Sequence, residues 1–137
     1  MTIFYRNLST ISKTDSPEQA LEKINTAFYI IEEVKERVEE TWLYWFTQYL
    51  NRLQEEEISD EQRKVKMNLV NPKYVLRNYM AQLAIDAADK EDYSLIDELY
   101  TLLQNPYDEQ PKMEKWFAKR PDWARVKIGC SMLSCSS

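Results

Sequence analysis

Apolar residues recur at intervals of three and four along most of this 137-residue chain. Such spacing places side chains on one face of an α-helix, whereas a half-buried strand alternates apolar and polar residues. Two of these sets are Ala20, Ile24, Ala27, Phe28 and Ile31, and then Val38, Trp42, Trp45, Phe46, Tyr49, Leu50 and Leu53. No segment shows a convincing run of alternation. We therefore predict an all-α fold, an irregular bundle of about six to eight helices joined by short loops.

Capping residues and prolines predict where these helices begin, because a side-chain oxygen can accept from a free helix N–H and proline suits the first turn. The expected starts lie at Ser16 and Pro17, at residues 59–62 (SDEQ, a capping-box pattern), at Asn71 and Pro72, after Asp92, and at Pro111. The helix that starts at Pro72 has an expected core face of Leu76, Tyr79, Met80, Leu83 and Ala87.

Residues 17–55 allow two interpretations, because no glycine or proline separates the two apolar sets in this stretch. Charge crowds around residues 32–37, and a break there would give two helices of ordinary length. The alternative is one long helix that dimerises as a short coiled coil through residues 20–53.

The length fits one helical domain, which we expect over residues 1–128, followed by a flexible tail at residues 129–137. The tail carries both cysteines, Cys130 and Cys135. Accessible thiols can take part in oxidation or disulfide exchange, but two free thiols without a role are the equal alternative. Lys127 is the nearest cation that could stabilise a thiolate, which weakens the case for a small thiol-dependent enzyme.

Missing residue types exclude several kinds of active site. Gly129 is the one glycine, whereas phosphate-cradling loops need several, and the chain has no histidine. We therefore expect no nucleotide site, no histidine-based metal site, no bound cofactor and no catalytic residue in this chain.

Charge and hydropathy argue against two classes of partner. A net charge of −5 argues against binding of nucleic acid, which needs a basic surface. The apolar runs are too short to cross a membrane, and the first residues do not resemble a secretory signal. Cysteines confined to the last eight positions favour a reducing compartment.

Three other groups of residues could form a site, and each has a simpler structural explanation. Asp108 and Glu109 lie in a proline-bounded loop, where acids most often cap a helix or face solvent. Lys73 and Arg77 would share a helix face and could bind an anion, or could form local ion pairs. The aromatic residues of positions 42–49 could line a ligand pocket, but at helical spacing they are more often core.

Several ordered blocks resemble the carboxy-terminal region of the selenoprotein O (SelO, YdiU) family. They are residues 71–79 (NPKYVLRNY), 105–111 (NPYDEQP), 119–124 (KRPDWA) and 135–137 (CSS). Residues 2–8 (TIFYRNL), 59–63 (SDEQR) and 67–68 (MN) fit the stretch just upstream in that family, whereas residues 9–55 match only in being helical and aromatic.

The resemblance implies that the parent protein is a kinase-like enzyme, a pseudokinase that transfers AMP from ATP to protein hydroxyl groups. It implies ATP and magnesium as cofactors of the parent, bound in a kinase-like core upstream of these residues. Cys135 stands where some members have selenocysteine, and the resemblance suggests that it is a redox residue that pairs with a cysteine of that core. Cys130 has no assigned counterpart, so a Cys130–Cys135 disulfide stays open.

The first functional hypothesis is a helical fragment of a SelO-like protein adenylyltransferase that packs on the kinase-like core and carries the redox tail. Its compartment would be a bacterial cytoplasm, or the mitochondrion for a eukaryotic source. Such a fragment would expose the apolar face that meets the core, and this face could drive self-association. The alternative is a stand-alone interaction module, dimeric through residues 20–53.

Overall fold

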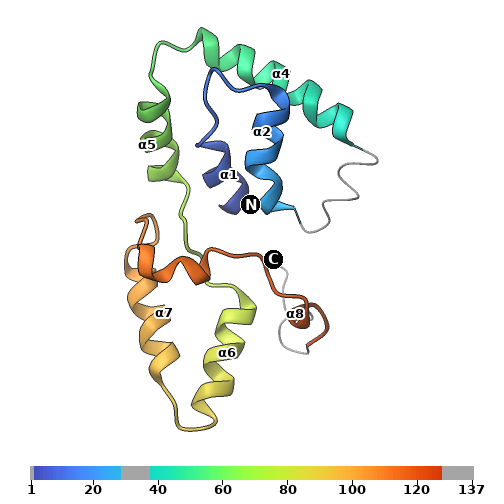
Figure 1. The fold of residues 1–137 in the computed structure, drawn as a ribbon. Helices are drawn as coiled ribbons and strands as arrows, with labels where there is room; N and C mark the ends of the chain where they lie inside the picture. The colour runs from blue at the N-terminus through green and yellow to red at the C-terminus, as the bar shows by residue number, and fades with distance from the viewer. Residues whose placement is uncertain (1, 29–37, 128–137) are drawn as a thin grey trace. The chain divides into compact units, whose positions relative to one another are not determined.

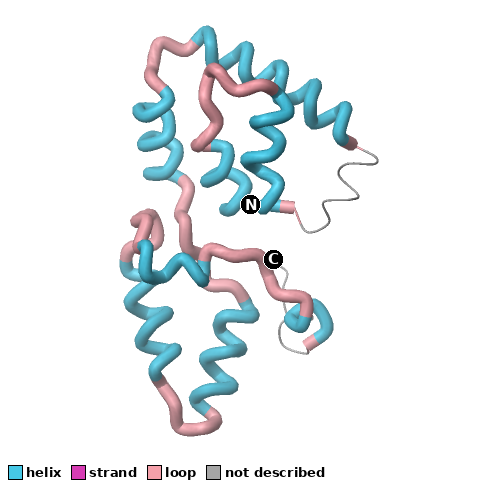
Figure 2. The backbone as a smooth tube through the Cα atoms, viewed as in Figure 1, coloured by secondary structure: helices cyan, strands magenta, loops and turns pink. Residues whose placement is uncertain are grey.

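The structure is a computed structural model that describes residues 2–28 and 38–127. These residues form α-helices and two short 3₁₀ helices, and Figure 2 shows helices and loops but no strand among them, so the all-α prediction is confirmed. They divide into two compact units, residues 1–72 and residues 73–137, here called the N-terminal and C-terminal units. The expected boundary between a helical domain and a tail, at residues 128 and 129, lies outside the described residues and stays a prediction.

The described residues of the N-terminal unit form five helical elements (Figure 1): α1 (Thr2–Leu8), α2 (Pro17–Ile24), η1 (Asn25–Ala27), α4 (Glu39–Glu55) and α5 (Asp60–Val70). Helix α2 packs against α1 and α4, and α1 also packs against α5. Their shared core is apolar and consists of Leu8, Ile11, Ala20, Leu21, Ile24, Phe46, Leu50 and Leu53. The two predicted capping starts are confirmed, since Ser16 and Ser59 each form a complete capping box with a glutamine at the third helical position.

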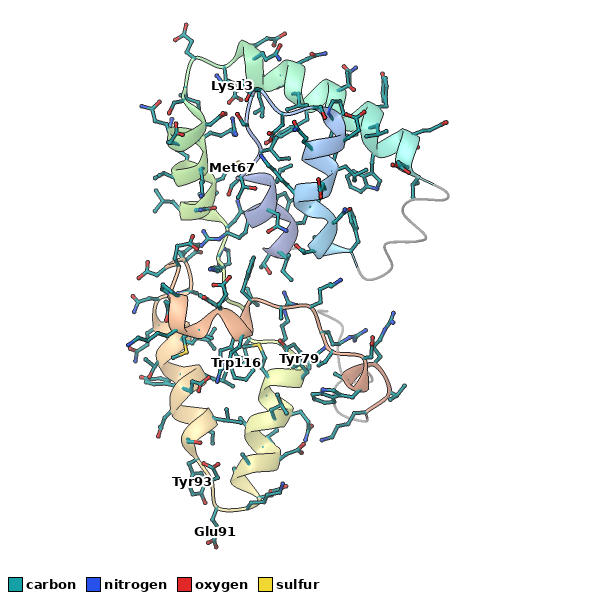
Figure 3. The ribbon with its side chains drawn as sticks, viewed as in Figure 1. Lys13, Met67, Tyr79, Glu91, Tyr93 and Trp116 are labelled. Carbon is teal, nitrogen blue, oxygen red and sulfur yellow. The ribbon has the colours of Figure 1, made fainter. Side chains whose placement is uncertain are left out.

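The C-terminal unit is built on an antiparallel pair of helices, α6 (Asn78–Ala88) and α7 (Ser94–Gln104), which Figure 1 shows joined by one turn. The 3₁₀ helix η2 (Pro111–Trp116) and the short α8 (Trp123–Val126) complete it. Trp116 and Tyr79, labelled in Figure 3, belong to its core. The other buried members of this core are Tyr74, Met80, Ala84, Leu99, Leu102 and Ala124.

Of the two interpretations of residues 17–55, the alternative of one long helix is wrong. Helix α2 ends at Ile24, η1 follows, and Phe28 has an extended backbone with φ −91° and ψ 142°. Thr26 accepts a hydrogen bond from Asn7 of α1, and the Phe28 ring packs 5.2 Å from that of Trp42, so tertiary contacts hold the chain out of the helix. The break therefore starts before residues 32–37, which lie outside the described residues. A continuous coiled-coil seam through residues 20–53 loses its basis.

The prediction of a helix start at Asn71 and Pro72 is also wrong. Residues 71–77 are not helical, and α6 begins at Asn78. The backbone N–H groups of Lys73 and Tyr74 both donate to the carbonyl oxygen of Pro106, at 2.8 and 3.0 Å. This long-range pairing replaces the helical hydrogen bonds that the local sequence favoured. As a consequence Leu76, expected in the core, is exposed.

Candidate functional site

Lys73 lies at the centre of the C-terminal unit's most connected polar cluster. Its Nζ donates to Glu109 Oε2 at 2.9 Å and to Glu114 Oε2 at 2.6 Å, and it also donates to the Glu109 carbonyl oxygen at 3.1 Å. The same ammonium lies 5.1 Å from the centroid of the Phe117 ring, within the range of a cation–π contact. Only 7 % of the Lys73 side chain is exposed, whereas its two carboxylate partners are more than half exposed.

These contacts set the charge state of Lys73. Burial lowers the pKa of its ammonium, but the hydrogen bonds to Glu114 and Glu109 more than offset this, so the pKa lies above its ordinary value. The lysine is therefore charged and neutralised by two carboxylates. An ammonium so occupied is a poor anion receptor, and its contacts order the surrounding chain.

The neighbouring Tyr74 links the same segments. Its hydroxyl donates to the carbonyl oxygens of Glu109 and Gln110, at 2.8 and 3.2 Å, and its ring is almost fully buried. Gln110 has a positive φ of 39°, and its side chain donates to the carbonyl oxygens of Leu102 and Asn105. Burial raises the pKa of the Tyr74 hydroxyl, which therefore stays protonated as a donor. The loop of residues 105–111 is thus held from both sides.

The cluster brings together blocks that are far apart in the sequence. Arg77 donates to the Ala118 carbonyl oxygen at 2.8 Å, which connects residues 71–79 with the segment before residues 119–124. Lys73 and Arg77 do not share a helix face, contrary to prediction, because residues 71–77 are not helical. Of the two loop acids, Glu109 belongs to the cluster through its ion pair with Lys73, whereas Asp108 is not part of the cluster.

A second polar cluster, in the N-terminal unit, was missed by the sequence analysis. Asp60 accepts from the Ser12 hydroxyl at 2.7 Å, from the Lys13 backbone N–H and from Arg63 Nη1 at 2.6 Å. Nη2 of the buried Arg63 donates to the Ile11 carbonyl oxygen. Desolvation raises the pKa of Asp60, but the Ser12 and Arg63 hydrogen bonds outweigh it and the pKa lies below its ordinary value. The spacing of an acid and an arginine three residues apart was the available signal.

The aromatic residues of α4 are partly core and partly surface. Phe46 is fully buried, and Trp42 packs against the core, whereas Tyr44 and Trp45 are exposed. Trp45 stacks on Tyr49 with centroids 5.2 Å apart and an interplanar angle of 7°. The core interpretation holds for the inner members of this set.

The predicted redox residues, Cys130 and Cys135, lie outside the described residues, and their role stays a prediction. Within residues 2–28 and 38–127, no group of three or more acidic or cysteine side chains could hold a metal ion. In that same part of the chain, no helix has both the length and the apolar character needed to cross a membrane.

Comparison with known proteins identifies the family. The family model described as "Protein adenylyltransferase SelO" matches residues 2–104. The chain is 72 % identical over 137 residues to the protein nucleotidyltransferase YdiU of Flavobacterium johnsoniae, and 47 % identical to the YdiU proteins of Rhodopirellula baltica and Aromatoleum aromaticum. All of this chain is covered in each case, but only 26 %, 27 % and 25 % of those relatives.

The chain therefore spans about a quarter of the length of these relatives. The family-model match includes the blocks at residues 59–63 and 71–79. These two blocks contain Arg63 and Lys73, the central cations of the two polar clusters. The blocks at residues 105–111 and 119–124 lie beyond that match but within the region similar to the F. johnsoniae protein. On this evidence the chain belongs to the SelO (YdiU) family.

Proposed function

We propose that this chain is the carboxy-terminal helical region of a SelO-like protein adenylyltransferase, a protein that transfers AMP from ATP to protein hydroxyl groups. The proposal is supported by family membership together with two features of the chain. The chain spans about a quarter of the length of its relatives, and it has one glycine and no histidine. Such a sequence lacks the means to cradle a triphosphate. The nucleotide site, with ATP and magnesium, belongs to the kinase-like core of the parent.

The two buried clusters support a mechanical role for the region. Asp60 neutralises Arg63, and Glu109 and Glu114 neutralise Lys73, so each of these two cations orders a loop and neither is free to bind a substrate. A region ordered in this way can present a rigid surface to the core. We expect it to pack on the kinase-like core in a bacterial cytoplasm, and self-association of the chain alone stays a prediction.

A chimera tests this proposal directly. The matching quarter of the F. johnsoniae relative, which is 72 % identical, would be replaced by these 137 residues. We expect ATP-dependent AMP transfer to a protein substrate, read by mass spectrometry, from the chimera and none from this chain alone. Transfer by the chain alone would refute the proposal, and so would an inactive chimera beside an active natural relative.

We also propose that Cys135 is a redox residue that forms a disulfide with a cysteine of the core. The step is a thiol–disulfide exchange in which two thiols lose two protons and two electrons to a small-molecule disulfide, which is reduced to two thiols. Peptide mapping of the chimera after exposure to oxidised glutathione should find Cys135 linked to the core, and Cys135→Ser should remove the link. A Cys130–Cys135 disulfide, or free thiols throughout, would refute the proposal.

A further inference from the structure

Lys127, the last described residue, is bonded back to helix α6. Its Nζ forms an ion pair with Asp86 Oδ2, and Gln82 Nε2 donates to Oδ1 of the same carboxylate at 2.8 Å. Gln82 lies one turn before Asp86 on α6, so the helix itself orients the carboxylate that receives Lys127. This end of the chain is therefore tied to a residue that lies 41 positions earlier in the sequence.

Helix α8, which comes directly before Lys127, is too short to be stable by itself, because a single turn does not offset the cost of helix nucleation. It has four residues, and its N-cap residue makes no side-chain cap hydrogen bond. Contacts with the rest of the C-terminal unit hold it instead. Ala124 is fully buried in the core, and the ring of Trp123 lies edge-on to that of Tyr79 with centroids 6.4 Å apart.

The ion pair and the aromatic contact form one arrangement. The Lys127 ammonium that pairs with Asp86 also lies 5.7 Å from the centroid of the Trp123 ring, within the range of a cation–π contact. We call Asp86, Trp123 and Lys127 the α8 clamp. Both charged side chains of the clamp are more than a third exposed, so the ion pair alone contributes little and the three residues act together.

The α8 clamp limits how far the two cysteines of the tail can reach. Cys130 and Cys135 follow Lys127 by three and eight residues. A chain spans at most about 3.6 Å per residue, so the Cα atom of Cys135 lies within about 29 Å of that of Lys127. If α8 were released, the carbonyl oxygen of Ala118, which accepts from Arg77, would be an earlier fixed point, and Cys135 follows Ala118 by 17 residues.

We propose that Asp86 is a positioning residue for the thiol chemistry of the tail. Through the α8 clamp it fixes the start of the tail on α6 and so raises the effective concentration of Cys135 at the core cysteine. The inference rests on the redox role proposed for Cys135. Effective concentration falls roughly as the −3/2 power of tether length, so a change from 8 to 17 residues lowers it about threefold.

A glutathione titration of the chimera with the F. johnsoniae relative tests this inference. Two protein thiols form the disulfide while one oxidised glutathione is reduced to two thiols, and peptide mass spectrometry gives the linked fraction at each glutathione ratio. We expect Asp86→Asn with Trp123→Ala to lower the equilibrium constant for the Cys135–core disulfide about threefold. Asp97→Asn with Tyr100→Ala, at exposed positions of α7, is the matched control and should leave this constant unchanged.

Exchange of the two charges tests the clamp without truncating Trp123. Asp86→Lys alone should lower the same constant, because two cations then repel, and Asp86→Lys with Lys127→Asp should restore it. An equilibrium constant that is unchanged in the Asp86 variants, or is lowered equally in the control, would overturn the positioning role alone. So would a charge exchange that fails to restore it. A chimera that forms no Cys135–core disulfide at all would refute the redox proposal and the positioning role with it.

Discussion

Each of the two units has a polar cluster around a buried cation, Arg63 in one and Lys73 in the other, but the two cations are held in different ways. In the N-terminal unit Arg63 pairs with Asp60, three residues earlier on the same helix, and both groups then hold the loop of residues 11–13. In the C-terminal unit Lys73 lies outside any helix, and its partners Glu109 and Glu114 are 36 and 41 residues away. Both clusters join segments that are far apart in the sequence. The acid that pairs with Arg63 lies on the same helix and is 28 % exposed, whereas the acids that pair with Lys73 are distant in the sequence and more than half exposed.

The difference shows how each unit depends on its charges. Removal of the buried Arg63 guanidinium takes one of several donors from the partly buried Asp60 and the side-chain donor from the Ile11 carbonyl oxygen, which is costly. An ammonium paired with exposed carboxylates leaves partners that water can solvate, so its removal costs less. The five experiments below, from the largest expected effect to the smallest, test that contrast.

Truncation of one core aromatic in each unit should give the largest effect. Phe46→Ala in the N-terminal unit and Tyr74→Ala in the C-terminal unit each remove a side chain that is almost fully buried. We expect each to lower the free energy of unfolding of its own unit by about 3–5 kcal/mol. Hydrogen exchange read peptide by peptide reports the two units separately. Loss of protection across both units from either substitution would show that they do not unfold separately.

Arg63→Met should destabilise the N-terminal unit by about 2–3 kcal/mol, because it removes the ionic partner of Asp60 and the side-chain donor of the Ile11 carbonyl oxygen. Urea unfolding followed by hydrogen exchange measures this. Arg52→Met is the matched control, since the Arg52 pair with Glu55 is exposed on both sides, and it should change stability by less than about 0.5 kcal/mol. Equal effects from the two substitutions would contradict the role assigned to Arg63.

Lys73→Met should destabilise the C-terminal unit by a smaller amount, about 1–2 kcal/mol, because Glu109 and Glu114 can return to water. The effect should shrink in 1 M salt, where charges are screened over about 3 Å, whereas that of Arg63→Met should persist. Denaturation at low and high salt makes the comparison. A Lys73→Met effect larger than that of Arg63→Met would reverse the order proposed for the two units.

Ser59→Ala should cost about 1 kcal/mol in the N-terminal unit, because it removes the capping hydroxyl of α5. Helices α6 and α7 have N-cap residues that make no side-chain cap hydrogen bond, so their starts depend on tertiary contacts. Ser59→Thr should keep most of the stability, since threonine also caps. A neutral Ser59→Ala would show that packing alone positions α5.

The stability of the N-terminal unit should depend on pH in the acidic range, and that of the C-terminal unit in the alkaline range. The lowered pKa of Asp60 stabilises the N-terminal unit above the unfolded-state value near 3.9, and this stability is lost as pH falls through the folded-state pKa. The raised pKa of Lys73 stabilises the C-terminal unit below about 10.4, and this is lost as pH rises through the folded-state pKa.

Asp60→Asn should therefore be less stable than the unchanged chain at pH 7, and this difference in the free energy of unfolding should decrease in acid. For Lys73→Met the difference in the free energy of unfolding should decrease in alkali. Urea unfolding across the pH range measures both. A gap for Asp60→Asn that stays constant down to pH 2 would contradict the role of its carboxylate charge.

Most of the features that the sequence predicts depend on contacts between residues close together in the chain. The helix starts at Ser16 and Ser59 are predictable because each hydroxyl accepts from a backbone N–H three residues ahead. The Asp60–Arg63 pair was missed, although its spacing is equally local. Lys73 and Glu109 were both singled out, but their contact could not be foreseen, because nothing in either block specifies the other.

The sequence by itself determined the all-α class, the capped helix starts and the absence of a glycine-rich nucleotide loop, since each depends on residue type and short spacing. Only the tertiary structure decided the course of residues 71–77. There the Asn-Pro signal for a helix lost to two backbone hydrogen bonds with Pro106 and to the burial of Lys73 and Tyr74. The same holds at Phe28, where packing on Trp42 ended a helix that the apolar spacing would have continued. Long-range contacts outweighed local preference at both places, because they satisfy the same backbone groups and bury more surface.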